Sequence, residues 1–360
     1  MKTAPSFLEK YVAIPHSAKP ITNANTYLYL NTTRFFSMFA IVFEHSFLLP
    51  NSERSLIEQF LMQIFKYGTV CFFLVSGFLI GVRQDYESKQ TKYYFSRVKS
   101  VFVPWLIFSS LLILIKTVSN LIKINTFDIT HALNEFFSTG KEIIFHTAYW
   151  FVPSYLITLI AFNILIKIKY CDISTFILSF VTTFFALNIY LNIIPSSHTT
   201  SIVAFLPILW LGYFIVKHQT EFLNIIIKIG KKKLYLLGII TLILQLIETY
   251  FINAAGVGDP FNTLRLSNLM YGIIVFCLFS HPDNSIQLPS FLNPRKSTFG
   301  IYLTHTLIGV VLGSVFKKLG LTDNLPSFYL LIVFFPLLYS LSTFLTLILH
   351  RTRLKFLLGG

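Results

Sequence analysis

Residues 28–49 read LYLNTTRFFSMFAIVFEHSFLL and form the first long apolar stretch of the chain. A helix needs about 20 residues to cross a hydrocarbon core of roughly 30 Å, so this stretch is long enough to span a membrane. It nevertheless contains three ionisable residues, Arg34, Glu44 and His45. Such side chains are costly in lipid and usually face a protein interior or a water-filled cavity. The stretch therefore predicts a membrane helix whose polar side chains serve function or packing.

The composition of the whole chain supports a membrane protein. Of the 360 residues, 54% are hydrophobic and only 12% are charged, and the mean hydropathy is +0.67. A soluble domain carries about 25% charged residues, so a soluble chain is excluded, as are disordered and collagen-like chains. The three cysteines have no Cys-x-x-Cys spacing, which argues against a disulfide framework or a cysteine metal site.

Ten apolar windows of membrane-spanning character recur along the chain, so we predict an all-α polytopic integral membrane protein with about ten transmembrane helices. The predicted segments are Leu28–Leu49, Tyr67–Val82, Ser100–Val118, Tyr149–Ile166, Ile173–Leu191, Ser201–Val216, Leu234–Ile252, Arg265–Phe279, Thr298–Phe316 and Phe328–Leu349. In the long connection between the third and fourth windows, apolar residues recur at helical spacing after Asp128, which predicts an interfacial amphipathic helix. These residues are Ile129, Leu133, Phe136 and Phe137.

The distribution of basic residues predicts the topology. The chain has 29 Lys+Arg against 15 Asp+Glu, a net charge of +14 that in a soluble protein would indicate nucleic-acid binding. Here 20 basic residues fall on one side of the ten windows and 8 on the other, so the charge reports topology and no nucleic-acid partner is expected. Both termini are predicted to be cytoplasmic. We expect a cytoplasmic tail over residues 1–27 without a signal peptide, a membrane domain over 28–349 and a cytoplasmic tail over 350–360.

The ionisable residues of the first window have a distinctive spacing. Arg34 and His45 are eleven residues apart, which is close to three helical turns and roughly 16 Å in depth on one face. The two side chains could bind the two ends of one long ligand. Alternatively, they could form hydrogen bonds with buried groups of the protein and serve only packing. Glu44 points about 100° away from His45, so it is poorly placed to orient the imidazole and could instead reach the outer interface. No metal site, P-loop or dinucleotide fingerprint is present.

Five motifs follow one another along the chain. The first is Arg34 followed after ten intervening residues by His45, and the second is Phe72-Phe-Leu-Val-Ser76-Gly77-Phe-Leu-Ile. They are followed by Tyr94-Phe-Ser-Arg97 with Pro104, by Tyr149-Trp150-Phe-Val and by Ser297-Thr-Phe-Gly-Ile-Tyr302-Leu-Thr-His305. In order and spacing these motifs resemble those of the acyltransferase-3 family of membrane acyltransferases. The chain departs from the family at Val101, where a second basic residue is common and where Lys99 is a possible substitute.

The resemblance implies transfer of an acyl group, usually acetyl, from cytosolic acyl-CoA to a hydroxyl of a cell-surface glycan or lipid-linked sugar. His45 would be the general base, because an imidazole of ordinary pKa about 6.5 titrates closest to working pH. Glu44 is its neighbour in the predicted catalytic site. No permanently bound cofactor is expected, since acetyl-CoA or another acyl-CoA is the donor substrate. The predicted location is the bacterial cytoplasmic (inner) membrane.

The remaining site residues divide into a donor group and an acceptor group. Basic side chains suit phosphate. Tyr302 and His305 lie about 6 to 11 Å into their helix from the cytoplasmic side, a depth that matches Arg34 rather than His45, so we assign them to the donor channel or to packing and not to acid–base catalysis. The donor group is Arg34, Arg83, Arg97, Lys99, Tyr302 and His305. Trp150 and Tyr149 are aromatic-belt residues or line the acceptor side, and Glu248 either orients His45 or reaches water.

Ser76-Gly77 is better explained as a small-residue contact between two close helices than as a serine nucleophile, since no strand-turn-helix setting surrounds it. A transporter or exporter of a glycan or small solute is the alternative function, because ten helices with buried charges also suit translocation. The sequence shows no inverted repeat and no paired Gly/Pro-broken helices in corresponding halves, which favours the enzyme.

Overall fold

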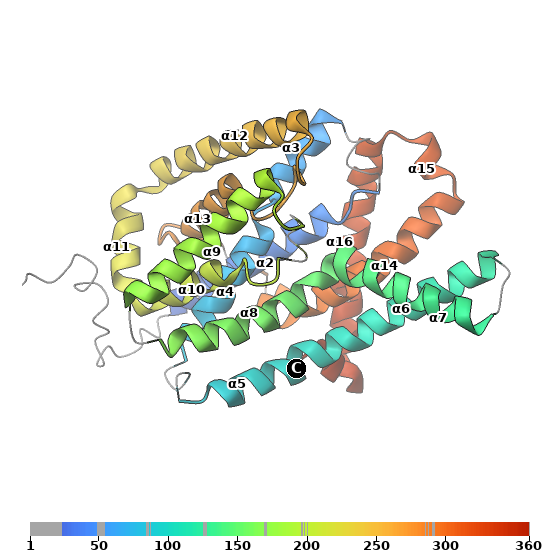
Figure 1. Ribbon diagram of the computed structural model, residues 1–360, viewed down its shortest axis with the longest axis horizontal. Helices are drawn as coiled ribbons and strands as arrows, with labels where there is room; N and C mark the ends of the chain where they lie inside the picture. Colours follow the sequence, from blue (N-terminus) through green and yellow to red (C-terminus); the bar gives the residue numbers. More distant parts are fainter. Residues whose placement is uncertain are drawn as a thin grey trace, which may run out of the picture.

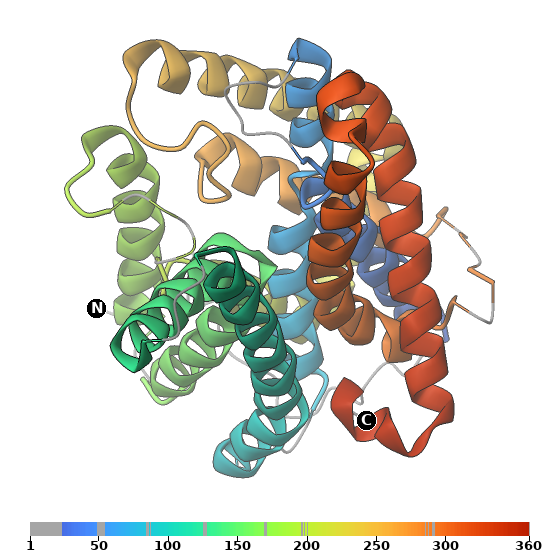
Figure 2. The same ribbon diagram turned by 90° about the vertical axis from the view of Figure 1, so that its right-hand side faces the viewer.

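The structure is a computed structural model (Figures 1 and 2) that describes residues 24–359 except 49–54, 84–85, 87, 125–127, 169–170, 196, 198, 200, 285, 287 and 290–291. The described residues form helices and no strands, which confirms the predicted all-α class. Residues 1–23 of the predicted N-terminal tail lie outside the described part. The tail boundaries therefore stay a prediction.

Each of the ten predicted segments contains a helix. They are α2 (Ala24–Glu44), α4 (Gly68–Gly81), α6 (Val103–Ile124), α8 (Phe151–Ile166), α9 (Cys171–Leu191), α10 (Leu206–Lys217), α12 (Lys231–Ala255), α13 (Leu266–Ser280), α14 (Pro294–Lys318) and α16 (Ser327–Arg351). Shorter elements connect them: α3 (Leu56–Phe65), α5 (Gln90–Arg97), α7 (Ile129–His146), α11 (Gln219–Ile229), α15 (Leu321–Asn324), a π-helical turn (Val98–Phe102) and 3₁₀ turns at Ala148–Trp150 and Arg353–Leu358.

Length and composition decide which of these helices can cross a membrane. Six helical stretches within the described residues qualify: Leu56–Gly81, Gln90–Lys123, Ala148–Ile166, Lys231–Ala255, Pro294–Lys318 and Ser327–Arg351. Shorter apolar helices cover Phe176–Leu191, Leu206–Lys217 and Leu266–Ser280. The chain is therefore a multi-pass membrane protein. The number of ten crossings and the cytoplasmic position of both termini remain predictions.

Helix α2 lies at the centre of the bundle, where it packs against α3, α4, α13, α14 and α16. Around it the other helices form pairs, α4 with α10, α12 with α13, and α14 with α16. Helices α6 and α7 form a hairpin that projects from one end of the molecule (Figure 1). Because α2 has neighbours on several sides, its polar side chains must face protein or enclosed space.

The basic stretch between the second and third apolar windows, residues 83–99, is helical from Gln90 onward. Helix α5 continues through the π-helical turn Val98–Phe102 into α6, giving one helical stretch over Gln90–Lys123. The sequence did not indicate this continuity because Gln90–Arg97 is polar and was counted as a connection. π-Turns within α-helices are frequent at functional sites, and this one follows Arg97 directly.

The helix predicted after Asp128 is present as α7. The Asp128 carboxylate accepts a hydrogen bond from the His131 backbone N–H at 3.1 Å, which caps the helix start. Helix α7 packs on α6 and is tied to it by an ion pair of 2.8 Å between Lys116 and Glu142. Ile129, Leu133 and Phe137 stay exposed, as an interfacial helix requires.

The Ser76-Gly77 motif is a close helix contact, as predicted. A Cβ atom built on Gly77 would lie 1.8 Å from the carbonyl oxygen of Leu209 in α10. Across the same contact, a Cβ on Gly212 would lie 2.1 Å from the carbonyl oxygen of Leu74. Both neighbours are backbone atoms, which cannot rotate away, so α4 and α10 pack backbone to backbone. The Ser76 hydroxyl donates to the Phe72 carbonyl at 2.7 Å, within its own helix.

Gly77→Val is expected to destabilise the protein strongly, because the added methyl groups must push two helix backbones apart. Overpacking typically costs about 1–3 kcal/mol, and backbone contact puts this variant at the upper end. The matched control is Gly309→Ala, whose new Cβ would meet only the Leu338 side chain at an ordinary 3.7 Å. Thermal unfolding in detergent, with aggregation as the measured signal, should give a lower melting temperature for Gly77→Val than for Gly309→Ala. Equal melting temperatures would contradict the close-packing interpretation.

The predicted topology can be tested by cysteine labelling in intact cells. A single cysteine at the exposed Lys141 of α7 should react with an impermeant maleimide added from outside, and one at Lys355 should not. Both variants should react fully after the cells are broken. Labelling at Lys355 in intact cells would overturn the prediction that the C-terminus is cytoplasmic.

Candidate functional site

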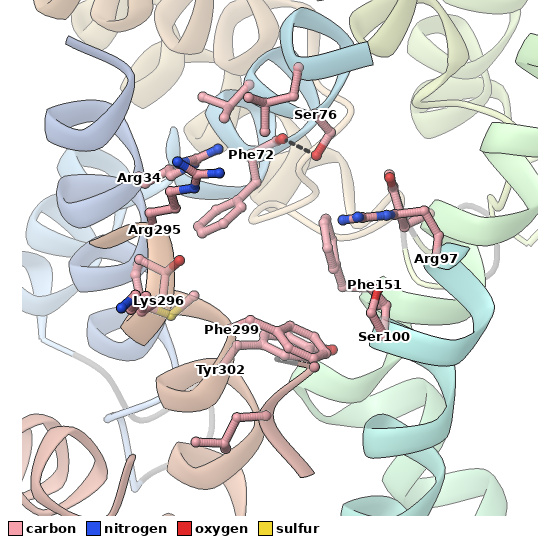
Figure 3. Close-up of a pocket in the computed structure, with 18 of the residues that line it drawn as sticks. Arg34, Phe72, Ser76, Arg97, Ser100, Phe151, Arg295, Lys296, Phe299 and Tyr302 are labelled. Carbon is pink, nitrogen blue, oxygen red and sulfur yellow. Dashed lines mark hydrogen bonds between the residues drawn. The ribbon is translucent and has the colours of Figure 1, made fainter. Parts of the chain in front are cut away.

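A cavity of about 310 Å³, the Arg34 cavity, lies beside α2 from its midpoint at Arg34 to Ile41. Arg34, Met38 and Ile41 line it from α2, at the spacing of one helix face. Arg97 from α5 and Arg295 from α14 complete its basic wall. Figure 3 shows Arg34 and Arg295 side by side, with Arg97 on the opposite wall pointing into the space between them.

The electrostatics of the Arg34 cavity favour an anion. None of its described lining residues is acidic, although Arg34, Arg97, Arg295 and Lys296 all contribute to the wall. Arg34 donates to the Asn31 side-chain oxygen at 3.3 Å, a neutral partner. The buried Nε of Arg97 has no hydrogen-bond partner among the described residues. Guanidinium groups without carboxylates are well suited to phosphate, which they bind in a forked geometry.

The rest of the Arg34 cavity is aromatic and apolar. Phe72, Phe151, Phe299 and Tyr302 line it, and the rings of Phe299 and Tyr302 are stacked with 6.0 Å between centroids and 13° between planes. Such walls accommodate a flat ring or a thin apolar chain beside the charged groups. The cavity therefore suits a molecule that is anionic at one end and less polar at the other.

The C-terminal segment predicted as a tail contributes to this cavity. Helix α16 ends at Arg351, and the following 3₁₀ turn brings Leu358 and Gly359 to the cavity wall. Gly359 has a positive φ of 76°, and a Cβ there would lie 2.1 Å from the Ser100 carbonyl oxygen. Glycine is needed at this position for both reasons.

The remaining basic residues of the predicted donor group, Arg83 and Lys99, do not line the Arg34 cavity. Arg83 and Lys92 line a cavity of about 210 Å³ with Tyr93, which also lines the Arg34 cavity. The guanidinium groups of Arg83 and Arg97 lie 5.0 and 5.2 Å from the Tyr93 ring centroid, a cation–π arrangement. Lys99 is exposed and lines no described cavity, whereas Val101 does line the Arg34 cavity. Lys99 therefore does not substitute geometrically for a basic residue at position 101.

A third cavity of about 340 Å³, the His45 cavity, lies at the C-terminal end of α2. Its walls are polar and include Glu44, His45, Lys66, His146 and Asp259. Helix α2 ends at Glu44, so His45 lies just past the last helical residue and is exposed to this space. Ile41 lines both this cavity and the Arg34 cavity. The two spaces therefore adjoin at one side chain of α2.

Glu44 has a different partner from those predicted. Its carboxylate forms an ion pair of 2.8 Å with the Lys66 Nζ, and the exposed fractions of the two side chains are only 9% and 5%. Glu44 thus points neither at His45 nor out to an interface, because a buried carboxylate needs a counter-charge and Lys66 supplies it. Its second oxygen, Oε1, has no hydrogen-bond partner within the described structure.

Tyr149 and Trp150 are interior residues rather than an aromatic belt. Tyr149 is fully buried and its hydroxyl donates to the Leu303 carbonyl at 2.8 Å. In the reverse direction, the Tyr302 hydroxyl donates to the Ala148 carbonyl at 2.7 Å. These two bonds lock the turn Ala148–Trp150 onto α14, and only Trp150 reaches the His45 cavity.

His305 lies next to His45, not at the depth of Arg34 as the sequence indicated. The two imidazole centroids are 5.6 Å apart. The depth estimate was wrong because α14 begins at Pro294 and places Arg295, rather than Tyr302, at the level of Arg34. Arg295 and His305 are ten residues apart, about 15 Å along the axis of α14, which is close to the roughly 16 Å between Arg34 and His45 on α2. Tyr302 does line the Arg34 cavity, as predicted.

Glu248 lies away from His45. Its carboxylate accepts hydrogen bonds from the hydroxyls of Tyr190 and Ser267 and, at 3.3 Å, from the Ser267 backbone N–H. It therefore anchors the first turn of α13 and lines none of the described cavities. The prediction that it could orient His45 has no support in this geometry.

Sequence reasoning missed Lys66, His146 and Arg295. Lys66 and His146 were counted with the connections, since each lies near the end of a helix. Arg295 carried a weaker signal, because its separation from His305 is ten residues, one fewer than the separation of Arg34 from His45. In the described ranges, no group of three His, Cys, Asp or Glu side chains could hold a metal ion.

Comparison with known proteins is informative at the level of the family. No curated protein and no solved structure gives a significant match to the chain. A family model described as an acyltransferase domain matches residues 27–351, which is nearly the whole chain and includes every motif quoted from the sequence. The chain belongs to this family of membrane acyltransferases, as its motifs predicted.

Proposed function

We propose that this protein transfers an acyl group, acetyl in the first instance, from cytosolic acyl-CoA to a hydroxyl of a cell-surface glycan or lipid-linked sugar. The observation that supports this most is the pair of adjoining cavities on α2, one basic and one polar, that share Ile41. A transferase with donor and acceptor on opposite sides of a membrane needs two such spaces that meet at the reacting groups. The predicted setting is the bacterial cytoplasmic membrane.

The Arg34 cavity is the donor site in this proposal. Coenzyme A carries phosphates at one end and a thioester at the other, joined by a long thin arm. Arg34, Arg97 and Arg295 would bind the phosphates, and the aromatic wall with Tyr302 would pack against the adenine or the arm. The thioester would then point along α2 towards Ile41 and His45.

The His45 cavity is the acceptor site. A sugar presents hydroxyl groups, which suit a wall of charged and polar side chains such as Lys66, His146 and Asp259. His45 removes the proton from the acceptor hydroxyl as its oxygen attacks the thioester carbonyl carbon. A C–O bond forms, the C–S bond breaks, and the imidazolium returns the proton to the departing CoA thiolate.

A transporter remains the competing function, and one experiment separates the two. Purified protein in lipid nanodiscs, given acetyl-CoA labelled in the acetyl group together with membrane glycan extracted from the parent cells, should transfer label to the glycan. A transporter would leave the label on CoA, because translocation breaks no thioester. Absence of transfer with every extracted glycan fraction, from protein that binds acetyl-CoA, would overturn the proposal.

A further inference from the structure

His305 is a buried imidazole with one nitrogen in use. It is 1% exposed, and its Nδ1 lies 3.1 Å from the Ile301 carbonyl oxygen, one turn earlier in α14. A carbonyl oxygen only accepts, so Nδ1 carries the proton. A buried imidazole without a counter-charge is neutral, which leaves Nε2 with a free lone pair. Nε2 has no hydrogen-bond partner among the described residues.

The position of His305 gives that lone pair a natural partner. The His305 ring lies 5.6 Å from the His45 ring and 6.0 Å from the Tyr302 ring, measured between centroids. It therefore stands between the imidazole of the polar cavity and a wall residue of the basic cavity. With Nδ1 turned back onto its own helix, Nε2 is the edge available to a neighbour.

The two carboxylates predicted to lie beside His45 or to orient it are engaged elsewhere. Glu44 forms its ion pair with Lys66, and Glu248 accepts hydrogen bonds from Ser267 and Tyr190. A third carboxylate, Asp259, lines the His45 cavity and accepts a hydrogen bond from the Phe261 backbone N–H at 2.9 Å. A general base acts best when a further group fixes its tautomer, as recurs in catalytic dyads and triads. His305 combines proximity to His45 with an unused acceptor nitrogen.

We propose that His305 is the positioning residue of His45. The rings lie 5.6 Å apart between centroids without a hydrogen bond between them, and a turn of the exposed His45 ring towards His305 lets Nε2 accept a hydrogen bond from one ring nitrogen of His45. That bond fixes the tautomer in which the other nitrogen of His45 is unprotonated and can take the proton of the acceptor hydroxyl. His305 keeps its own Nδ1 proton throughout, and the proton taken by His45 leaves with the CoA thiol. The inference rests on the proposed acyl transfer and adds a residue to it.

The test compares His305→Phe, which fills the space without an acceptor, with His305→Gln, whose amide oxygen can accept. Release of CoA thiol from acetyl-CoA is measured on the purified full chain in nanodiscs, with methyl glucoside or water as acceptor, per molecule that binds acetyl-CoA. His305→Phe should lower kcat on the order of 10- to 100-fold with little change in KM for acetyl-CoA, and His305→Gln should recover most of it. If the phenylalanine variant does not fold, His305→Leu takes its place.

Two controls separate positioning from packing. His131→Phe removes another imidazole with an unpartnered buried Nε2, one that lines none of the described cavities, and should leave kcat unchanged. In a His45→Ala background, His305→Phe should cause no further loss, since there is no base left to orient.

The outcomes distinguish the two proposals. A raised KM with unchanged kcat for His305→Phe, equal defects in the Phe and Gln variants, or a further loss in the His45→Ala background would overturn the positioning role alone. If the wild-type protein binds acetyl-CoA but releases no thiol with any acceptor, the proposed acyl transfer fails, and the positioning role fails with it.

Discussion

His45→Ala is expected to lower turnover by about 10²- to 10⁴-fold, the range usual for a lost acid–base group. The variant should still insert, fold and bind acetyl-CoA, because His45 lies past the end of α2 and is exposed to its cavity rather than packed in the core. Thiol release and acetyl transfer are measured per acetyl-CoA-binding molecule. In the wild type the rate should rise with pH as the imidazole loses its proton, since only the neutral ring accepts one.

A packing role for His45 would give a different pattern. The substitution would then lower thermal stability and yield, while the surviving folded fraction would turn over normally. His131→Ala, outside the cavities, is the matched control for loss of an imidazole. Near wild-type turnover in folded His45→Ala protein would end the proposed mechanism.

The helices were predictable because each one is a local property of the sequence. Every apolar window contains a helix, and the periodic residues after Asp128 form α7 with Asp128 as its cap. The stripe from Arg34 to His45 was also predictable, since one helix face is fixed by the residue spacing. It lines two adjoining cavities through Ile41.

Contacts between helices were not predictable from spacing alone. The depth of His305 depended on where α14 begins and on how far α14 is shifted along α2, and only the structure shows that His305 lies beside His45. The partner of Glu44 depended on the position of Lys66, which lies between α3 and α4, 22 residues further along the chain. Residue spacing fixes which side chains share a face of one helix, but not which helix packs against that face.

The contribution of Leu358 and Gly359 to the wall of the Arg34 cavity was also not predictable from the sequence. The segment after residue 349 follows the last apolar window and carries the basic residues Arg351, Arg353 and Lys355, so it was predicted to be a cytoplasmic tail. Its last residues are apolar or glycine, and that ending allows the 3₁₀ turn to close against Ser100. That contact depends on the position of Ser100 in space, which the sequence does not show.

Arg34→Ala is expected to weaken acetyl-CoA binding by about 10- to 100-fold, which corresponds to the roughly 1.5–3 kcal/mol of a hydrogen bond to a charged group. Arg34 is half-buried in a cavity without described acidic residues, so water screens its charge poorly and no carboxylate competes for it. Arg34→Lys should recover part of the affinity, because an ammonium keeps the charge and loses the forked geometry.

Lys99→Ala is the matched control for this prediction. It removes the same charge from the neighbouring basic stretch, but Lys99 is exposed and outside the cavity, so affinity should change by less than about twofold. Titration of each purified variant with acetyl-CoA at low and at high salt measures both effects. The Lys99 effect should vanish at high salt, while most of the Arg34 effect should persist, because partly buried charges are screened less. If folded Arg34→Ala protein bound acetyl-CoA as tightly as the wild type, the basic cavity would not be the donor site.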